Sequence, residues 1–253
     1  MAGSHLRKKT PLSYQDRKYR RVENSGLVPF VVKMAETDLH ILAPRPVGDQ
    51  ALQLVSEVRG YIERYIEQHP RFVDTLVPMP MNKQAPEIVK KMLTAGMQAG
   101  VGPMAAVAGV VAEWVGQGLL AQGYDEVIVE NGGDLFVARN QACTVAVYAG
   151  ESPLSGKLAI GLQPDQMNCG VCCSSGTIGH SLSLGNADAV VVVAPSTALA
   201  DAAATRLGNE VCRGKKSINR ALELAGKIDG LSGVVIISGD RLGAWGDIEL
   251  VQL

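Results

Sequence analysis

The sequence is poor in aromatic residues and in charge, and it has no long apolar run. Phenylalanine, tryptophan and tyrosine make up 4% of its 253 residues, and charged residues make up 19%. The formal net charge is −1, which argues against nucleic acid or an anionic membrane as a partner held by bulk electrostatics. No uninterrupted apolar stretch approaches the ~20 residues that cross a bilayer. What remains is an Ala-, Val- and Gly-rich chain, long enough to bury the core of one large domain or two small ones.

Motifs that would identify a common activity are missing as well. No predicted strand leads into Gly-x-Gly-x-x-Gly and there is no Walker loop, so a dinucleotide-binding or P-loop protein has no support. The Ser-Gly-Thr-Ile-Gly segment at residues 175–179 is not the Gly-x-Ser-x-Gly elbow of a serine hydrolase. The function therefore has to be argued from less specific features of the chain.

The cysteines, five in number, do not form the pattern of a disulfide framework. They fit a reducing compartment, and Met1–Arg21 lacks the apolar segment of a secretory signal, so we expect a cytoplasmic protein. Cys169, Cys172 and Cys173 lack a second ligand pair at zinc-finger spacing, although His180 follows eight residues after Cys172. We interpret these three as small buried thiols without a zinc or redox role.

The order of predicted elements indicates a basic N-terminal arm over residues 1–24 and a single domain over residues 25–253. The predicted strands are 28–32, 39–42, 125–130, 135–138, 143–149, 157–162, 187–193, 233–238 and 242–250. The predicted helices are 47–68, 86–98, 103–122 and 217–228, with one more between Pro195 and Gly208. This mixed order favours an α+β fold with mixed or antiparallel sheets and packed helices, rather than alternating βαβ units.

The predicted helix at residues 103–122 is rich in Ala, Gly and Val. Its small side chains would allow it to lie close against a sheet, and a proline stands in its first turn. Glu113, Gln117 and Gln122 interrupt the apolar sequence, so we expect a core helix rather than a membrane span.

The turn Asn131-Gly132-Gly133-Asp134 is the first candidate for ligand binding. It joins two predicted strands, and two successive glycines permit positive φ and a close approach of the backbone to a ligand. A plain hairpin turn would use the same residues. The sequence alone leaves both interpretations open.

A hydroxyl- and glycine-rich loop is the second candidate. Backbone N–H and hydroxyl groups in such a loop can bind a phosphate without strong positive charge. The donors would come from Ser174, Ser175, Gly176, Thr177 and Gly179. His180 follows directly and could act as a base or donate to an oxyanion, or it could orient the loop.

The third candidate lies on the helix that follows a buried strand and Pro195. Ser196 or Thr197 is suited to cap this helix. Asp201 and Thr205 are four residues apart, so they lie on one helix face and offer hard oxygen ligands suited to Mg²⁺. The alternative is that Asp201 only adds negative charge near the start of the helix, where a carboxylate is favourable.

The loop, the Val-Val-Val-Ala-Pro segment at 191–195 and the Asp-Ala-Ala-Ala-Thr segment at 201–205 together resemble the C-terminal signature of the ApbE family. Members of that family transfer FMN from FAD onto a protein Thr or Ser in a Mg²⁺-dependent reaction. The resemblance implies an ApbE-like, T-fold-like architecture, a flavin as FAD or FMN, and Mg²⁺ held by Asp201 and Thr205. It also implies catalytic roles for His180 and Asp201, and a cofactor site at Asn131–Asp134 and in the Ser174–Gly179 loop.

Most of the chain resembles a group of short, uncharacterised ApbE-like proteins, which supplies a fold and a site but no reaction. The resemblance is carried by residues 36–39, 101–109, 129–134 and 174–181. The longer His-His-x-x-Asp-Pro segment of the transferases is shortened here to Gly179–Ser183. Two hypotheses stay open: a flavin transferase-like enzyme, and a non-enzymatic protein that binds a phosphorylated small molecule. The sequence also leaves open whether the chain forms a homo-oligomer. We expect the turn, the loop and the Asp201 helix to converge on one pocket.

Overall fold

The computed structural model describes residues 26–175, 185–211 and 215–253. The predicted N-terminal arm therefore lies outside the described residues. The helices are α1 (Gly48–Gln68), α2 (Arg71–Asp74), α3 (Glu87–Ala99), η2 (Pro103–Ala106), α4 (Val107–Ala121), η3 (Pro164–Gln166), α5 (Thr197–Glu210) and α6 (Lys215–Ala225). The strands are β1 (Val28–Met34), β2 (Thr37–Ala43), β3 (Val127–Asn131), β4 (Asp134–Ala138), β5 (Cys143–Ala146), β6 (Leu158–Leu162), β7 (Cys169–Ser174), β8 (Ala189–Ala194), β9 (Gly233–Ser238), β10 (Arg241–Gly246) and β11 (Glu249–Gln252).

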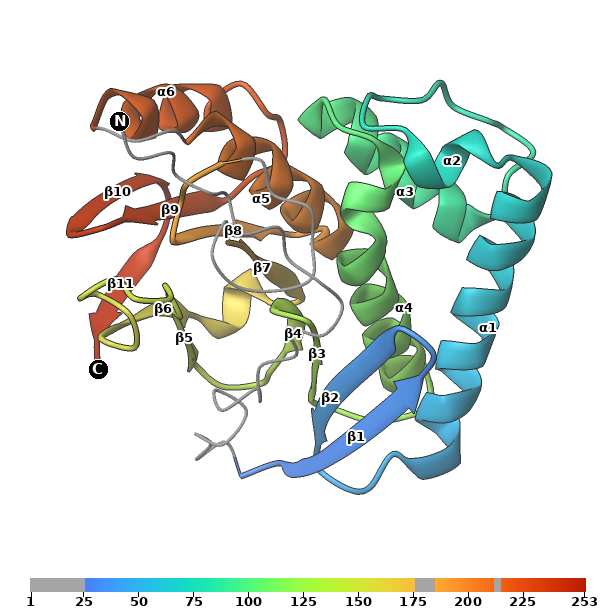
Figure 1. Cartoon of the computed structure of the whole chain (residues 1–253). Helices are drawn as coiled ribbons and strands as arrows, with labels where there is room; N and C mark the ends of the chain where they lie inside the picture. The colour runs from blue at the N-terminus through green and yellow to red at the C-terminus, as the bar shows by residue number, and fades with distance from the viewer. Residues whose placement is uncertain (1–25, 176–184, 212–214) are drawn as a thin grey trace.

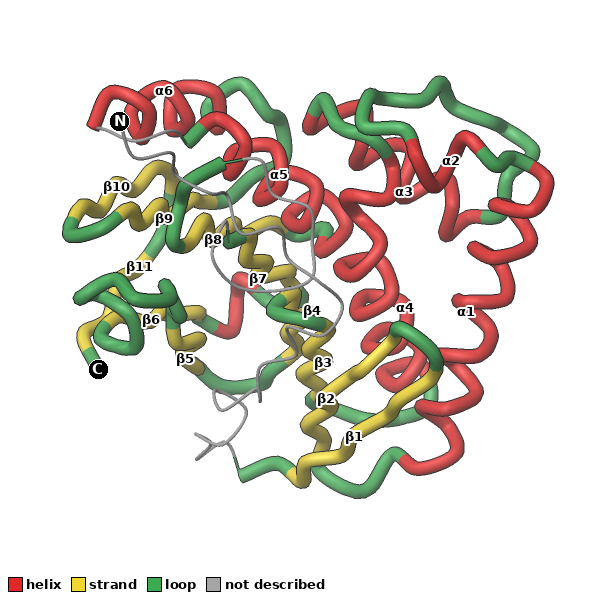
Figure 2. Tube along the Cα trace, viewed as in Figure 1, coloured by secondary structure: helices red, strands yellow, loops and turns green. Residues whose placement is uncertain are grey.

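Two antiparallel sheets form the β part of the described chain. The larger has eight strands in the order β1-β2-β3-β4-β7-β8-β9-β10, and the smaller has three in the order β11-β6-β5 (Figure 1). Helices α4 and α5 pack on one face of the large sheet, and α1 and α3 pack against them. Figure 2 shows the longer helices along the top and right of the view, and most of the strands toward its lower left. The expected α+β class is confirmed.

Strand β8 shows why both faces of the large sheet are buried. Its six residues are all buried, and they alternate between two hydrophobic clusters. Val190 and Val192 join the cluster under the helices, while Val191 and Val193 join the cluster under the small sheet. A continuous β-branched run is the pattern expected for a strand covered on both faces.

Helix α4 is a core helix, as its small residues predict. Residues Pro103–Ala121 are apolar and long enough to cross a membrane by composition, but half of that stretch is buried inside the fold. A Cβ added to Gly116 would lie 2.1 Å from the ring of Phe136 on β4, and one added to Gly118 would lie 2.5 Å from Leu54 on α1. Such close approaches leave no room for larger side chains, so α4 is wedged between the sheet and α1.

One strand was not predicted, and one predicted strand was wrong. No strand was predicted over residues 169–174, which form β7 in the centre of the large sheet. The predicted strand 242–250 is two strands, β10 and β11, which belong to different sheets. The break falls at Gly246, where φ is +83° and a Cβ would lie 2.4 Å from the carbonyl oxygen of Ser232. Only glycine meets both constraints without strain.

Candidate functional site

The turn between β3 and β4 is tied to helix α4. Gly132 and Gly133 adopt positive φ values of 70° and 108°, as the hairpin requires. The backbone N–H of Gly133 donates to the side chain of Glu130 at 2.8 Å. The side-chain amide of Asn131 donates to the carbonyl oxygen of Ala108, at the start of α4, at 3.1 Å. The turn therefore serves as an anchor for α4 as well as a hairpin.

Asp134 begins β4 and points toward the helices. It pairs with Cys172 of β7, and it lies on the same strand face as Phe136, whose ring packs against α4. The side chain is buried, with 4% of its surface exposed. Burial raises the pKa of Asp134 well above its usual range, and the charge of Asp201 raises it further. A carboxyl group in such a place resists ionisation unless a cation is near.

Asp201 projects from the second turn of α5, whose N-terminus is capped by Ser196. The Ser196 hydroxyl oxygen accepts a hydrogen bond from the N–H of Leu199 at 3.3 Å, as expected for a capping serine. One carboxylate oxygen of Asp201 accepts a hydrogen bond from the backbone N–H of Gly109 at 2.8 Å. The carboxylate thus caps the first turn of α4, a neighbouring helix, rather than only adding charge to its own. Burial raises the pKa of Asp201 to about 7, against the lowering effect of the Gly109 and Ala108 amides.

Asp134 and Asp201 together form a buried acidic pair. Their charges interact across the space between β4 and α5. Within the described ranges, no Lys, Arg or His forms an ion pair with either carboxylate. Thr205 lies one helical turn after Asp201 and is half-buried. Buried carboxylates are stable as anions only when a cation or several hydrogen-bond donors balance them, so this donor set suits a hard cation.

The acidic pair offers few ligands on its own. In the part of the chain that the structure describes, no group of three or more His, Cys, Asp or Glu side chains is arranged to hold a metal. A cation at Asp201 would therefore take its other ligands from hydroxyl, backbone, water or ligand oxygens. Mg²⁺ is commonly bound in this way, through one or two carboxylates and substrate phosphates.

The described parts of the three predicted segments meet. Gly133 in the turn lies beside β7, and a Cβ added to it would be 3.8 Å from the carbonyl oxygen of Cys173. Ser174 ends β7 and is buried, and Ser175 follows it. Asp134, directly after the turn, interacts with Asp201 on α5. The other predicted members of the loop, which are Gly176, Thr177, Gly179 and His180, lie outside the described residues.

A shallow, open groove of the described residues lies elsewhere, between α6 and β10. Its volume is about 580 Å³. It is lined by Asn219, Leu222, Glu223, Gly226, Lys227 and Trp245. None of these residues belongs to the predicted site, so a single pocket at the acidic pair stays a prediction.

Of the cysteines near the site, Cys169 and Cys172 are buried and Cys173 is half-buried. Burial raises the pKa of Cys169 and of Cys173 to about 12, and it raises that of Cys172 well above its usual value. The Cys172 thiol donates to the carbonyl oxygen of Thr197 at 3.4 Å and also lies against the Asp134 carboxylate. Thiols this hard to ionise are poor nucleophiles at neutral pH.

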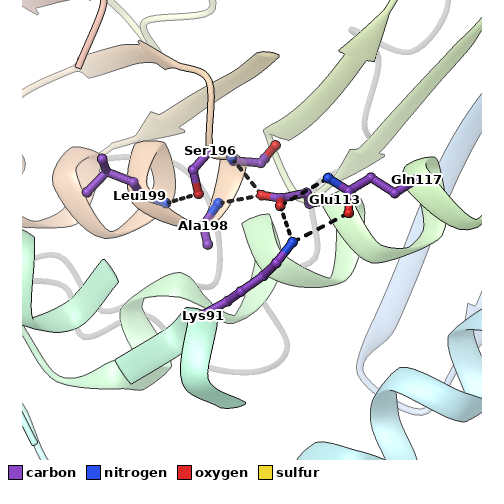
Figure 3. A network of polar contacts seen from close by, with 7 residues as sticks. Lys91, Glu113, Gln117, Ser196, Ala198 and Leu199 are labelled. Carbon is purple, nitrogen blue, oxygen red and sulfur yellow. Dashed lines mark hydrogen bonds and ion pairs between the residues drawn. The ribbon is translucent and has the colours of Figure 1, made fainter. Parts of the chain in front are cut away.

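Sequence reasoning missed the role of Glu113, which it treated only as an interruption in an apolar helix. The side chain is buried, and one of its oxygens accepts hydrogen bonds from the N–H groups of Thr197 at 2.9 Å and Ala198 at 3.4 Å. Its other oxygen lies 2.6 Å from the ammonium of Lys91 on α3, and Gln117 donates to it at 3.3 Å (Figure 3). A lone Glu in an otherwise apolar helix was the available signal, because such a charge needs a partner.

Comparison with known proteins places the chain among curated relatives of similar length. The family described as "AbpE bacteria" matches residues 20–232. A UPF0280 protein of Methanosarcina acetivorans is 37% identical over 220 residues, covering 87% of this chain and 87% of the relative. The UPF0280 protein MmarC7_0482 of Methanococcus maripaludis is 43% identical over 221 residues, covering 86% of this chain and 90% of the relative.

Solved structures with the same fold are found at low sequence identity. The apo form of the flavinyl transferase ApbE of Pseudomonas stutzeri aligns with a TM-score of 0.58 and 16% identity, over 87% of this chain and 94% of that one. The flavin transferase ApbE of Vibrio cholerae aligns with a TM-score of 0.55 and 13% identity, over 86% of this chain and 96% of that one. These matches show a common fold.

Proposed function

This chain belongs to the family described as "AbpE bacteria", and from that premise we propose that its acidic pair holds a divalent cation that binds the phosphates of a flavin or a related nucleotide. The ligand would be a small molecule, with no nucleic acid or membrane involved. The finer form of the proposal is transfer of FMN from FAD, which the resemblance to the ApbE family implies. The structural neighbours are named as a flavinyl transferase and a flavin transferase.

The observation that carries the proposal is the acidic pair itself. Two carboxylates, Asp134 and Asp201, are buried beside each other, and neither has a cationic partner among the described residues. A protein gains stability by avoiding this arrangement, because each buried charge costs several kcal/mol when it is not compensated. A site that binds Mg²⁺ explains why both are present.

The donor set fits such a cation. Asp201 and Thr205 supply hard oxygens from one face of α5, and Asp134 adds negative charge from the sheet. When bound, the cation would supply positive charge to phosphate oxygens, which a chain of net charge −1 does not supply by a basic cluster. Around it, the Asn131–Asp134 turn would bring backbone close to the ligand, and Ser174 and Ser175 would donate hydroxyl hydrogen bonds. Gly176, Thr177 and Gly179 would extend this cradle, and His180 would serve as the base of a transfer.

The alternative is a binding protein that keeps the site without the transfer. It is favoured by the short Gly179–Ser183 segment, which replaces a longer His- and Asp-containing segment of the transferases. It is also favoured by the low aromatic content, with 3 Phe and 2 Trp available to stack on an isoalloxazine ring. In this form the ligand is a phosphorylated small molecule other than a flavin.

Titration of the purified protein with FAD and with FMN tests the flavin proposal. The titrations are made with and without Mg²⁺, and flavin fluorescence reports binding. A Mg²⁺-dependent change supports the proposal, whereas no change up to about 1 mM ligand, equivalent to roughly −4 kcal/mol, contradicts it. Incubation of FAD and Mg²⁺ with a Thr- or Ser-containing acceptor peptide then separates an enzyme from a binder, because only an enzyme adds the mass of FMN to the peptide.

A further inference from the structure

Where helices α4 and α5 cross, each helix contributes a carboxylate that accepts hydrogen bonds from the first turn of the other helix. Glu113 on α4 accepts hydrogen bonds from the first-turn N–H groups of Thr197 and Ala198 on α5. Asp201 on α5 accepts one from the N–H of Gly109, in the first turn of α4. Gly109 and Glu113 are one helical turn apart on α4, and Thr197 and Asp201 are one turn apart on α5. The two contacts therefore lie next to each other in one helix–helix interface, one helical turn apart.

Each contact provides an acceptor for backbone N–H groups that would otherwise have no hydrogen-bond partner. The first N–H groups of a helix have no partner inside the helix, and a carboxylate beside them is stabilised by the helix dipole. The two carboxylates differ in charge balance, because Glu113 forms an ion pair with Lys91, whereas Asp201 has no cationic partner among the described residues. Figure 3 shows Glu113 held between Lys91 of α3 and the start of α5. Glu113 is therefore the charge-balanced contact, and Asp201 is the contact without a cationic partner in the described part of the chain.

The first turn of α5 is also confined from two sides. A Cβ added to Gly170 of β7 would lie 2.4 Å from the Cα of Thr197, and one added to Gly109 would lie 2.4 Å from its carbonyl oxygen. The backbone of Thr197 thus packs between the sheet and α4 with no intervening side chain. Hydrogen bonds from this turn to Glu113 fix its orientation, and Asp201 follows on the same helix face one turn later.

We propose that Glu113 is a positioning residue for the candidate metal carboxylate Asp201. Glu113 holds the start of α5, and this keeps the Asp201 carboxylate against the Gly109 amide and facing Asp134. It makes no contact with the ligand itself. The effect on cation binding rests on the proposed function. The effect on the position of the Asp201 carboxylate rests on the helix geometry alone.

Glu113→Gln tests the proposal, with Glu126→Gln as a matched control. Glu126 likewise contacts a cation and accepts a backbone hydrogen bond. Its Oε1 lies 3.2 Å from Nε of Arg139, and the backbone N–H of Asn140 donates to it at 2.8 Å. It precedes β3, at the opposite end of the β3–β4 hairpin from the site. Two quantities are measured for both variants: hydrogen exchange of the Gly109 amide by NMR in metal-free protein, and the dissociation constant of Mn²⁺ by electron paramagnetic resonance.

The expected result is that Glu113→Gln speeds Gly109 exchange and weakens Mn²⁺ binding, each by about tenfold. The neutral amide loses the ion pair with Lys91, and its hydrogen bonds from α5 are weaker than those of a carboxylate. Glu126→Gln should leave both within about twofold of the wild type, as for distant independent sites. Unchanged Gly109 exchange in Glu113→Gln overturns the proposal, and so does an equal effect of the two variants. If the wild type binds no Mn²⁺, the proposed cation site fails and Gly109 exchange alone decides the positioning role. If Glu113→Gln does not fold, Lys91→Gln replaces it, with the same direction of change expected.

Discussion

The carboxylate of Asp201 on α5 accepts a hydrogen bond from the backbone amide of Gly109 on α4 at 2.8 Å. The contact requires glycine on the α4 side. A Cβ at this position would lie 2.8 Å from the Cβ of Asp201 and 2.4 Å from the carbonyl oxygen of Thr197. The same residue thus permits the helices to meet and gives Asp201 its partner.

Gly109→Ala is therefore expected to destabilise the fold by about 1–3 kcal/mol, the cost of overpacking, and to weaken Mn²⁺ binding. The free energy of unfolding from urea denaturation measures the first effect. Gly60→Ala in α1 is the control, because its Cβ would meet only the flexible end of Arg64, at 3.2 Å. That change should stabilise the protein by about 0.5–1 kcal/mol through helix propensity. Equal destabilisation by both substitutions would contradict the close crossing at Gly109.

Asp201→Asn should abolish Mg²⁺-dependent ligand binding while keeping the fold. The asparagine side chain has the same shape and retains one oxygen to accept the Gly109 N–H, but it removes the charge that a cation needs. Fluorescence titration of flavin with Mg²⁺ measures the loss, expected to be at least about tenfold. Asp188→Asn is matched to it, because Asp188 also accepts a backbone N–H, from Gly239 at 2.7 Å, away from the acidic pair. Retained Mg²⁺-dependent binding in Asp201→Asn would assign Asp201 to helix capping alone.

The metal-free protein should become less stable as the pH rises from about 4 to about 7. Both acidic pKa values are raised in the folded state, that of Asp201 from 3.8 to about 7, so the folded protein binds protons more tightly than the unfolded chain. The stability that protonation supplies is present below the unfolded pKa and is lost as the pH passes through the folded one. Each unit of pKa difference corresponds to about 1.4 kcal/mol, an upper value for a group that relaxes.

Urea denaturation in EDTA at several pH values measures this slope. The Asp134→Asn, Asp201→Asn double variant should show a flatter profile, since neither replaced group titrates. An identical pH profile for the wild type and the double variant would contradict this prediction. It would show that ionisation of Asp134 and Asp201 does not lower the free energy of unfolding. Adding Mn²⁺ should stabilise the wild type most at the higher pH values, where the carboxylates are charged.

The thiols of Cys169, Cys172 and Cys173 should react slowly with a disulfide reagent such as DTNB in the native protein. Their raised pKa values, about 12 for Cys169 and Cys173, leave almost no thiolate at neutral pH. Mass spectrometry of digested samples, with and without denaturant during labelling, resolves each position separately. Rapid native labelling of any of the three would contradict the assignment as inert core thiols.

Local sequence patterns were enough to predict most helices and most of the buried strands. Strand β8 was predictable because four consecutive valines have one plausible environment, a sheet covered on both faces. The start of α5 was predictable because Pro195 ends the strand and Ser196 caps the helix. The turn at Asn131–Asp134 was predictable because two glycines follow an apolar strand. Each of these signals lies within a few residues of the element that it specifies.

Features that depend on partners distant in the sequence could not be predicted in the same way. Strand β7 contains Gly170 and two adjacent cysteines, a weak strand pattern, and it is held in place by pairing with β4 and β8. The capping roles of Glu113 and Asp201 involve contacts across 84 and 92 residues of sequence. The expectation that Asp201 is a metal ligand came from its spacing to Thr205 and from a family resemblance, and it stays a prediction.

The pairing of β2 with β3 has a consequence for how the chain reaches this fold. Ile41 lies opposite Val129, and the whole helical segment from α1 to α4 lies between them in the sequence. Closing so long a loop costs entropy before any strand contact repays it, and proteins dominated by such pairings fold slowly. The β1–β2 hairpin and the helices can form early from local contacts, but the sheet that carries Asp134 is complete only after this closure. Refolding should therefore be limited by docking of the hairpin onto β3, and destabilising that contact should slow refolding more than an equal loss within α1.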